Sequence, residues 1–228
     1  MKRTDDILLV IDVQNDFMPG GTLAVPDGDA VVPVINALAA RFDQVVLTQD
    51  WHPRGHVSFA ANHPGHAPFS TLGLPYGEQV LWPVHCVQGT EGAALHRDLD
   101  IPHARVVIRK GHDTQVDSYS AFVEADRKTP TGLAGYLREL GAKRVWCCGL
   151  ATDYCVAWSA LDARAAGFDA AVIDDACRAI DLNGSLANAW QQLQAAGVAR
   201  VTSDSARPPG VARFPLTCQT NRRTYTWL

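Results

Sequence analysis

The feature that most constrains the fold is a nearly continuous apolar run, ILLVIDV, at Ile7–Val13. Such a run is typical of a parallel strand that is covered on both faces. Further short apolar segments follow it along the chain, at Val45–Thr48, Val106–Ile108, Val145–Gly149, Ala170–Ile173 and Val198–Thr202. Between them, helical spacing predicts helices from near Asp29, over Gly132–Leu140, over 153–166 and over Leu186–Ala196. Strands that alternate with helices form right-handed βαβ units. We therefore predict an α/β fold, a three-layer α/β/α sandwich around a parallel sheet of about six strands.

Two stretches depart from this alternation. Residues 50–100 are rich in His, Pro and Gly and show little periodicity. A loop of that length in a compact domain is usually functional or disordered, and its Trp, His and Cys content favours function. The tail from 207 to 228 has no clear period. We expect one domain over residues 1–206 and a C-terminal tail of unknown role over 207–228.

The composition excludes several classes of protein. A net charge of -4 argues against a nucleic-acid binder, which usually has a basic face. We expect no membrane span, because no apolar run approaches the roughly eighteen residues required, and the N-terminus lacks signal-peptide features. None of the six cysteines forms a CxxC pair, so we expect reduced thiols and a cytoplasmic protein. A homo-oligomer remains open.

Reactive side chains collect where the predicted strands end. Asp12 closes the first strand, Asp50 and His52 follow the second, Lys110 follows the third and Cys155 follows the fourth. Ligands of open α/β sheets bind outside the carboxyl ends of the strands. Each residue alone could be an ordinary strand-end or surface residue. Together they form an acid–base set, in which a carboxylate moves the cysteine proton and an ammonium supports the thiolate.

Cys155 has the strongest local argument for catalysis. Thr152 is a natural N-cap, which places Cys155 near the third helical position, where backbone N–H groups and the helix dipole favour an anion. We therefore expect the thiol pKa to fall below its free value of about 8.5. The same N–H groups can form an oxyanion hole. The alternative is a cysteine that only packs against the sheet.

A metal site is indicated by Asp50-Trp51-His52, with His56, His63, His66 and His85 downstream. In an extended segment, Asp50 and His52 point to the same side. One carboxylate and two imidazoles suit zinc, ferrous or manganous ion. The alternative is a histidine-rich surface loop, and the pattern alone does not select the third ligand.

Five stretches of this sequence resemble the motifs of one known family, and they occur in the same order as in that family. IDVQNDFMPGGTLAV, TQDWHPRGHVSF, LWPVHCVQGTEGAALH, RKGHD with VDSYSAF, and GLATDYCV look like the nicotinamidases (pyrazinamidases), which belong to the isochorismatase-like cysteine hydrolases. The resemblance runs from about residue 5 to about residue 205. Either DVQNDF or GLATDYCV alone would indicate only the wider group.

The resemblance implies roles for individual residues. It implies a catalytic triad of Asp12, Lys110 and Cys155, with an oxyanion hole formed by the N–H groups of Ala151 and Cys155 after a cis peptide at Leu150–Ala151. It implies Asp50, His52 and His85 as metal ligands, with His56 as a candidate additional ligand. Phe17 and Trp82 are expected to sandwich the substrate ring.

The implied reaction is hydrolysis of nicotinamide, and of pyrazinamide-type analogues, to the acid and ammonia in NAD salvage. The implied cofactor is one divalent metal ion, with zinc as the first choice and iron or manganese as alternatives. A small amide is the expected substrate. Two other readings stay open at this point: a hydrolase of another small amide, such as a carbamoyl or ureido compound, and a non-enzymatic thiol or metal-binding module.

Overall fold

The computed structural model describes residues 5–206, and its centre is one six-stranded parallel sheet. The strands lie in the order β5-β2-β1-β6-β7-β8. Their bounds are β1 (Asp6–Ile11), β2 (Val45–Asp50), β5 (Val106–Lys110), β6 (Arg144–Leu150), β7 (Asp169–Arg178) and β8 (Ala199–Val201). All six residues of β1 are buried, as the apolar run predicted.

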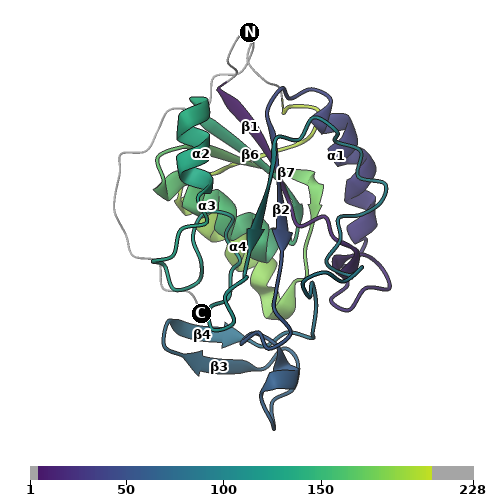
Figure 1. The fold of residues 1–228 in the computed structure, drawn as a ribbon. Helices are drawn as coiled ribbons and strands as arrows, with labels where there is room; N and C mark the ends of the chain where they lie inside the picture. The colour runs from purple at the N-terminus through teal and green to yellow at the C-terminus, as the bar shows by residue number, and fades with distance from the viewer. Residues whose placement is uncertain (1–4, 207–228) are drawn as a thin grey trace.

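Helices cover both faces of the sheet. Their bounds are α1 (Val31–Ala39), α2 (Leu133–Leu140), α3 (Ala157–Ala165) and α4 (Ser185–Ala195). Helix α1 lies on one face, and α2, α3 and α4 lie on the other (Figure 1). The predicted three-layer sandwich with six parallel strands is therefore confirmed.

The strand order places the site. The chain first builds β1, β2 and β5 outward in one direction, then returns to the other side of β1 to build β6, β7 and β8. The direction of winding thus reverses between β1 and β6. In open α/β sheets a ligand crevice forms at that reversal, outside the carboxyl ends of the strands. Asp12 follows β1 and Cys155 follows β6, so both lie at this place.

Residues 50–100 contain structure that their lack of periodicity concealed. They include a two-stranded antiparallel sheet, β3 (Thr71–Leu74) and β4 (Gly77–Val80). Its strands have four residues each and are largely exposed, so they carry little hydrophobic pattern. The hairpin lies beyond the carboxyl ends of β1 and β2, at the foot of the molecule in Figure 1.

The expected start of the helix after β6 is wrong. Residues Thr152–Val156 form a π-helical turn, and regular α-helix begins only at Ala157. The cap position is Ala151, with no side-chain cap hydrogen bond, and Thr152 is buried inside the turn. Single π-helical turns are found frequently at functional sites. Cys155 therefore lies in an irregular turn and not in the first turn of a capped α-helix.

Within residues 5–206, no helix is long and apolar enough to cross a membrane. The predicted tail over 207–228, with Cys218, lies outside the described residues.

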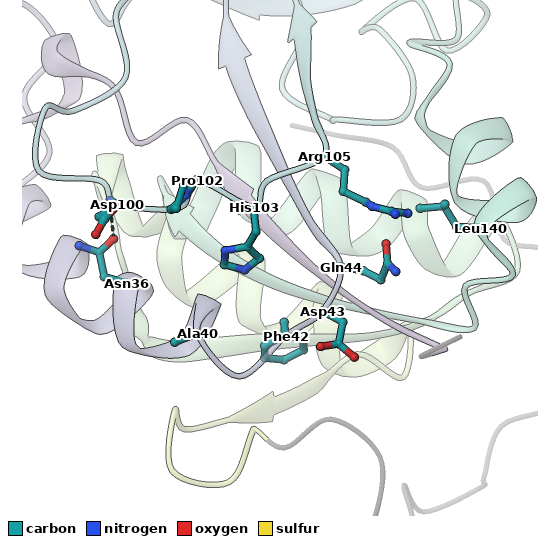
Figure 2. A pocket seen from close by; sticks show the side chains of 10 residues that line it. All are labelled: Asn36, Ala40, Phe42, Asp43, Gln44, Asp100, Pro102, His103, Arg105 and Leu140. Atoms are coloured by element: carbon teal, nitrogen blue, oxygen red, sulfur yellow. Dashed lines mark hydrogen bonds between the residues drawn. The ribbon is translucent and has the colours of Figure 1, made fainter. Parts of the chain in front are cut away.

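A wide groove of about 1100 Å³ lies at the opposite end of the sheet (Figure 2). It is lined by residues that precede β2 and β5, among them Gln44, His103 and Arg105. His103 Nε2 lies 3.1 Å from the carbonyl oxygen of Ala39 and is occupied by that contact. The groove lies at the amino ends of the strands, away from the cysteine and the histidine cluster.

Candidate active site

The strand ends bring the predicted catalytic residues together. Asp50 and Lys110 are the last residues of β2 and β5 and are paired directly in the sheet. Lys110 Nζ lies 2.9 Å from Asp12 Oδ2 and 3.3 Å from Cys155 Sγ. It also donates to Asp50 Oδ1, and to the Ser118 carbonyl at 3.0 Å. The expected grouping of Asp12, Lys110 and Cys155 is therefore present in one buried cluster.

Asp12 is held by its own backbone and by β2. Its φ of 50° turns the chain away from β1. The Thr48 hydroxyl donates to Asp12 Oδ1 at 2.5 Å and accepts from the Asp12 N–H at 3.1 Å. The other carboxylate oxygen, Oδ2, is buried and accepts no hydrogen bond of regular geometry, although Lys110 Nζ lies nearby. One Asp12 carboxylate oxygen lies within 4.8 Å of Cys155 Sγ, so the carboxylate and the thiol are neighbours.

Burial and charge set the protonation of this cluster. Burial raises the pKa of Asp12, and the Lys110 ammonium opposes the rise only in part. Burial alone would lower the pKa of Lys110, but the carboxylates of Asp12 and Asp50 raise it well above its ordinary value. Lys110 thus stays charged, and Asp12 is a stronger base than an exposed aspartate.

The expected acidic thiol at Cys155 is wrong. Burial, the largest effect, raises the pKa of Cys155 well above its ordinary value, and the charges of Asp12 and Asp50 add to the rise. Lys110 acts in the opposite direction but does not outweigh them. Cys155 therefore rests as a thiol and needs a base to take its proton before it can attack.

Asp50, His52 and His85 form a cluster suited to a metal ion. One possible ligand atom from each lies within 4.8 Å of the others. Asp50 Oδ2 lies 3.7 Å from His52 Nε2 and 3.9 Å from His85 Nε2. The Nδ1 atoms are occupied elsewhere, by the Gly111 carbonyl for His52 and the Pro83 carbonyl for His85, both at 2.8 Å.

Hydrogen bonds from Nδ1 to backbone carbonyls fix the tautomer that presents Nε2 as a ligand, which is usual for metal-binding histidine. The absence of a side chain at Gly111 allows the His52 ring to lie against this residue. Its φ is +65°, and a Cβ on it would come within 2.4 Å of His52 Cε1. Burial and the neighbouring His52 lower the pKa of His85 to about 4, so His85 is neutral and able to bind a cation. The three residues fit a divalent ion.

His56, the candidate additional ligand, stacks on His52 with ring centroids 4.2 Å apart. Its nitrogens already have partners, since Nδ1 lies 2.7 Å from Ser58 Oγ and Nε2 lies 3.2 Å from the Val116 carbonyl. It groups with His52 and Asp117, and not with Asp50 and His85. His56 therefore lies beside His52 but outside the Asp50–His52–His85 group, and its role as an additional ligand stays a prediction.

One cavity joins both clusters. Its wall includes Cys155, Ala151, Asp50, His52 and His85. Phe17 and Trp82, the predicted ring-binding aromatics, line the same cavity and are each at most 5% exposed. The peptide between Leu150 and Ala151 is cis, as expected.

Several cavity residues escaped the sequence interpretation. These are Leu23, Asp117, Ser118, Tyr119, Tyr154 and Ile180. Tyr119 and Tyr154 lie within VDSYSAF and GLATDYCV, so their position in the motifs was the available signal. Leu23 likewise lies within IDVQNDFMPGGTLAV, whereas Ile180 comes from a loop outside the quoted stretches.

The comparisons with known proteins agree with this site. Residues 6–205 match the isochorismatase domain, and the chain belongs to the isochorismatase family. A nicotinamidase of Acinetobacter baylyi is 60% identical over 89% of this chain and 95% of its own length. The structure of an Acinetobacter baumanii nicotinamidase/pyrazinamidase has a TM-score of 0.88 at 58% identity, covering 90% of this chain and 99% of that one. A pyrazinamidase of Pyrococcus horikoshii, solved in complex with zinc, has a TM-score of 0.72 at 36% identity, covering 87% and 99%.

Proposed function

We propose that this protein is a metal-dependent nicotinamidase, which hydrolyses nicotinamide to nicotinate and ammonia. The observation that carries the proposal is one cavity that joins three features: a buried Cys155–Lys110–Asp12 cluster, an Asp50–His52–His85 cluster and two aromatic walls. The nicotinamidase names of the Acinetobacter relatives support it. Pyrazinamide differs in its ring only and should also react. The place of such a reaction is NAD salvage, and we expect a cytoplasmic enzyme.

Asp50, His52 and His85 would hold the divalent ion. When bound, it supplies a Lewis acid that can take the ring nitrogen of the substrate. Zinc is our first choice, because the Pyrococcus relative was solved with zinc and because a carboxylate with two imidazoles suits it. Iron and manganese are the alternatives.

The first half-reaction uses Asp12 and Cys155. Phe17 and Trp82 hold the ring and direct the carboxamide toward Cys155 Sγ. Asp12 Oδ2 takes the thiol proton as sulfur attacks the carboxamide carbon. Lys110, 3.3 Å from Sγ, supports the developing thiolate. The N–H groups of Ala151 and Cys155 donate to the oxyanion of the tetrahedral intermediate. Asp12 then gives its proton to the amide nitrogen, the C–N bond breaks, and ammonia leaves a thioester.

The second half-reaction reuses the same base. Asp12 takes a proton from water as the water oxygen attacks the thioester carbon. The C–S bond breaks, the proton on Asp12 returns to the Cys155 sulfur, and the product leaves as nicotinic acid, which loses its proton to solvent to give nicotinate. A raised pKa at Asp12 suits this shuttle, because a proton acceptor that must also donate works best when its pKa approaches the working pH.

The test is ammonia release from a panel of amides, with and without a chelator. Nicotinamide and pyrazinamide should react, and the chelator should suppress turnover. Faster turnover of a carbamoyl or ureido compound, insensitive to chelator, would instead favour the hydrolase of another small amide. Metal uptake or thiol oxidation without turnover of any amide would favour the non-enzymatic module.

A further inference from the structure

We propose that the β3–β4 hairpin is a brace for the substrate-binding wall, and that Gln79 is the positioning residue through which it acts. The proposal rests on the proposed function where it concerns the substrate ring. It also explains why an exposed hairpin of four-residue strands contains a glutamine that is only 2% exposed.

Gln79 reaches the wall through Tyr119. Its Nε2 donates to the Tyr119 hydroxyl at 3.2 Å. That hydroxyl in turn accepts from the indole N–H of Trp82 at 2.9 Å. The backbone of Trp82 is fixed separately, since its N–H donates to the Ser58 carbonyl at 2.7 Å. The Tyr119 hydroxyl is therefore the hydrogen-bond partner that orients the indole N–H, while Phe69 and Tyr154 pack edge-on against the ring.

Gln79 also reaches the metal side of the cavity. Its Nε2 donates to Asp117 Oδ2 at 2.6 Å and to the Val80 carbonyl at 2.7 Å, while its Oε1 accepts from Tyr76 at 3.1 Å. Asp117 lies within 4.8 Å of His52 and His56. One amide thus links the aromatic wall to the residues that flank the metal cluster.

The amide group is required by charge as well as by shape. Both hydrogens of Nε2 are shared among three acceptors, one of them a carboxylate. A carboxylate at position 79 would keep the size but face Asp117 with like charge. An apolar side chain would leave buried polar atoms without their partner, which is costly. Either change should release Tyr119 and allow Trp82 to rotate.

The experiment compares Gln79→Leu with Glu78→Gln, an exposed neighbour on the same strand. In Gln79→Leu, KM for nicotinamide should rise about fivefold to tenfold, the size expected for one lost hydrogen bond. The kcat should change much less, because the catalytic cluster does not contact Gln79. Glu78→Gln should leave both constants unchanged. Tyr119→Phe removes the shared hydroxyl, so adding it to Gln79→Leu should produce no further rise in KM.

A second readout does not depend on turnover. The indole N–H of Trp82 can be assigned by NMR with Trp82→Phe, and its hydrogen exchange should be at least tenfold faster in Gln79→Leu than in wild type or Glu78→Gln. If Gln79→Leu changes neither the indole hydrogen exchange nor KM, the brace is refuted. This holds even if the melting temperature falls, because a lower melting temperature alone shows only a structural role. If Gln79→Leu fails to fold, Gln79→Glu, which keeps the size of the side chain but faces Asp117 with like charge, replaces it in both measurements. A wild type that is inactive on nicotinamide would refute the proposed function, while the exchange measurement would still decide on the brace.

Discussion

Replacing Asp12 with Asn tests whether the buried cluster is a working proton shuttle. Asn keeps the size of the side chain and tolerates the left-handed backbone at φ 50°. Its oxygen can still accept from Thr48, as Asp12 Oδ1 does at 2.5 Å. Lys110 keeps Asp50 and the Ser118 carbonyl as partners, so its charge is not left alone. The change therefore removes mainly the ability to accept and return a proton.

The size of the effect follows from the two half-reactions. General acid–base catalysis contributes about 10²–10⁴-fold. Turnover should fall by at least about 10²-fold, which corresponds to about 3 kcal/mol on the barrier. Because Asp12 acts in both half-reactions, the loss can exceed this range. Metal content and nicotinamide affinity should change far less, because Asp12 is neither a proposed ligand nor part of the cavity wall.

The assay combines steady-state ammonia release, metal analysis and calorimetric binding. Asp27→Asn is the matched control, because Asp27 also has a left-handed backbone, φ 53°, but is exposed and outside the cavity. It should behave as wild type. Near-normal turnover in Asp12→Asn would refute the mechanism, even if Cys155 proved to be the nucleophile.

Three further outcomes are expected. Cys155→Ala should abolish turnover while leaving the melting temperature close to wild type, because the smaller side chain fits the buried turn. Ammonia release above about 1% of the wild-type rate would show that another residue is the nucleophile. His85→Ala should lose the tightly bound ion, which elemental analysis of the purified protein would detect. Full metal content in this variant would place the third ligand elsewhere, with His56 the first residue to examine. The metal-free protein should lose stability as pH falls from about 6.5 toward 4. The reason is that the pKa values of His56 and His85 are lowered to about 4 in the folded protein, so the unfolded chain takes up those protons first. A melting temperature that stays constant over this range would contradict the prediction.

The sheet and the catalytic cluster were predictable for a simple reason. Ile7–Val13 and the later apolar runs are long enough to identify buried strands, and parallel strands deliver their carboxyl ends to one edge. Asp12, Lys110 and Cys155, which are far apart in sequence, therefore had to meet. Assignment of His85 depended on the resemblance, because spacing alone did not distinguish it from His56, His63 and His66. In the structure His85 Nε2 lies 3.9 Å from Asp50 Oδ2, whereas both ring nitrogens of His56 have other hydrogen-bond partners.

The hairpin and its glutamine could not have been predicted in this way. Strands β3 and β4 have only four residues each and bury few side chains, so the alternation in β3 is too short to identify a strand. Gln79 gains its place from Asp117 and Tyr119, which lie 38 and 40 positions further along the chain. Contacts of this kind between polar side chains leave no periodic trace in a sequence.

The error over the Cys155 pKa carries a mechanistic consequence. A helix terminus contributes typically about 0.3–1 kcal/mol at exposed positions. Burial has a larger effect on the pKa of a fully enclosed group, and at Cys155 it acts together with the two carboxylates beside the thiol. In the structure burial is the largest effect and the pKa rises. A cysteine that rests as a thiol resists adventitious oxidation and alkylation, since the thiolate is the reactive form. Its proton must then leave during attack, and Asp12 Oδ2, buried and without a regular hydrogen bond, is the group placed to receive it. In the proposed mechanism, the burial that keeps Cys155 protonated therefore makes turnover depend on a base, and Asp12→Asn tests whether Asp12 is that base.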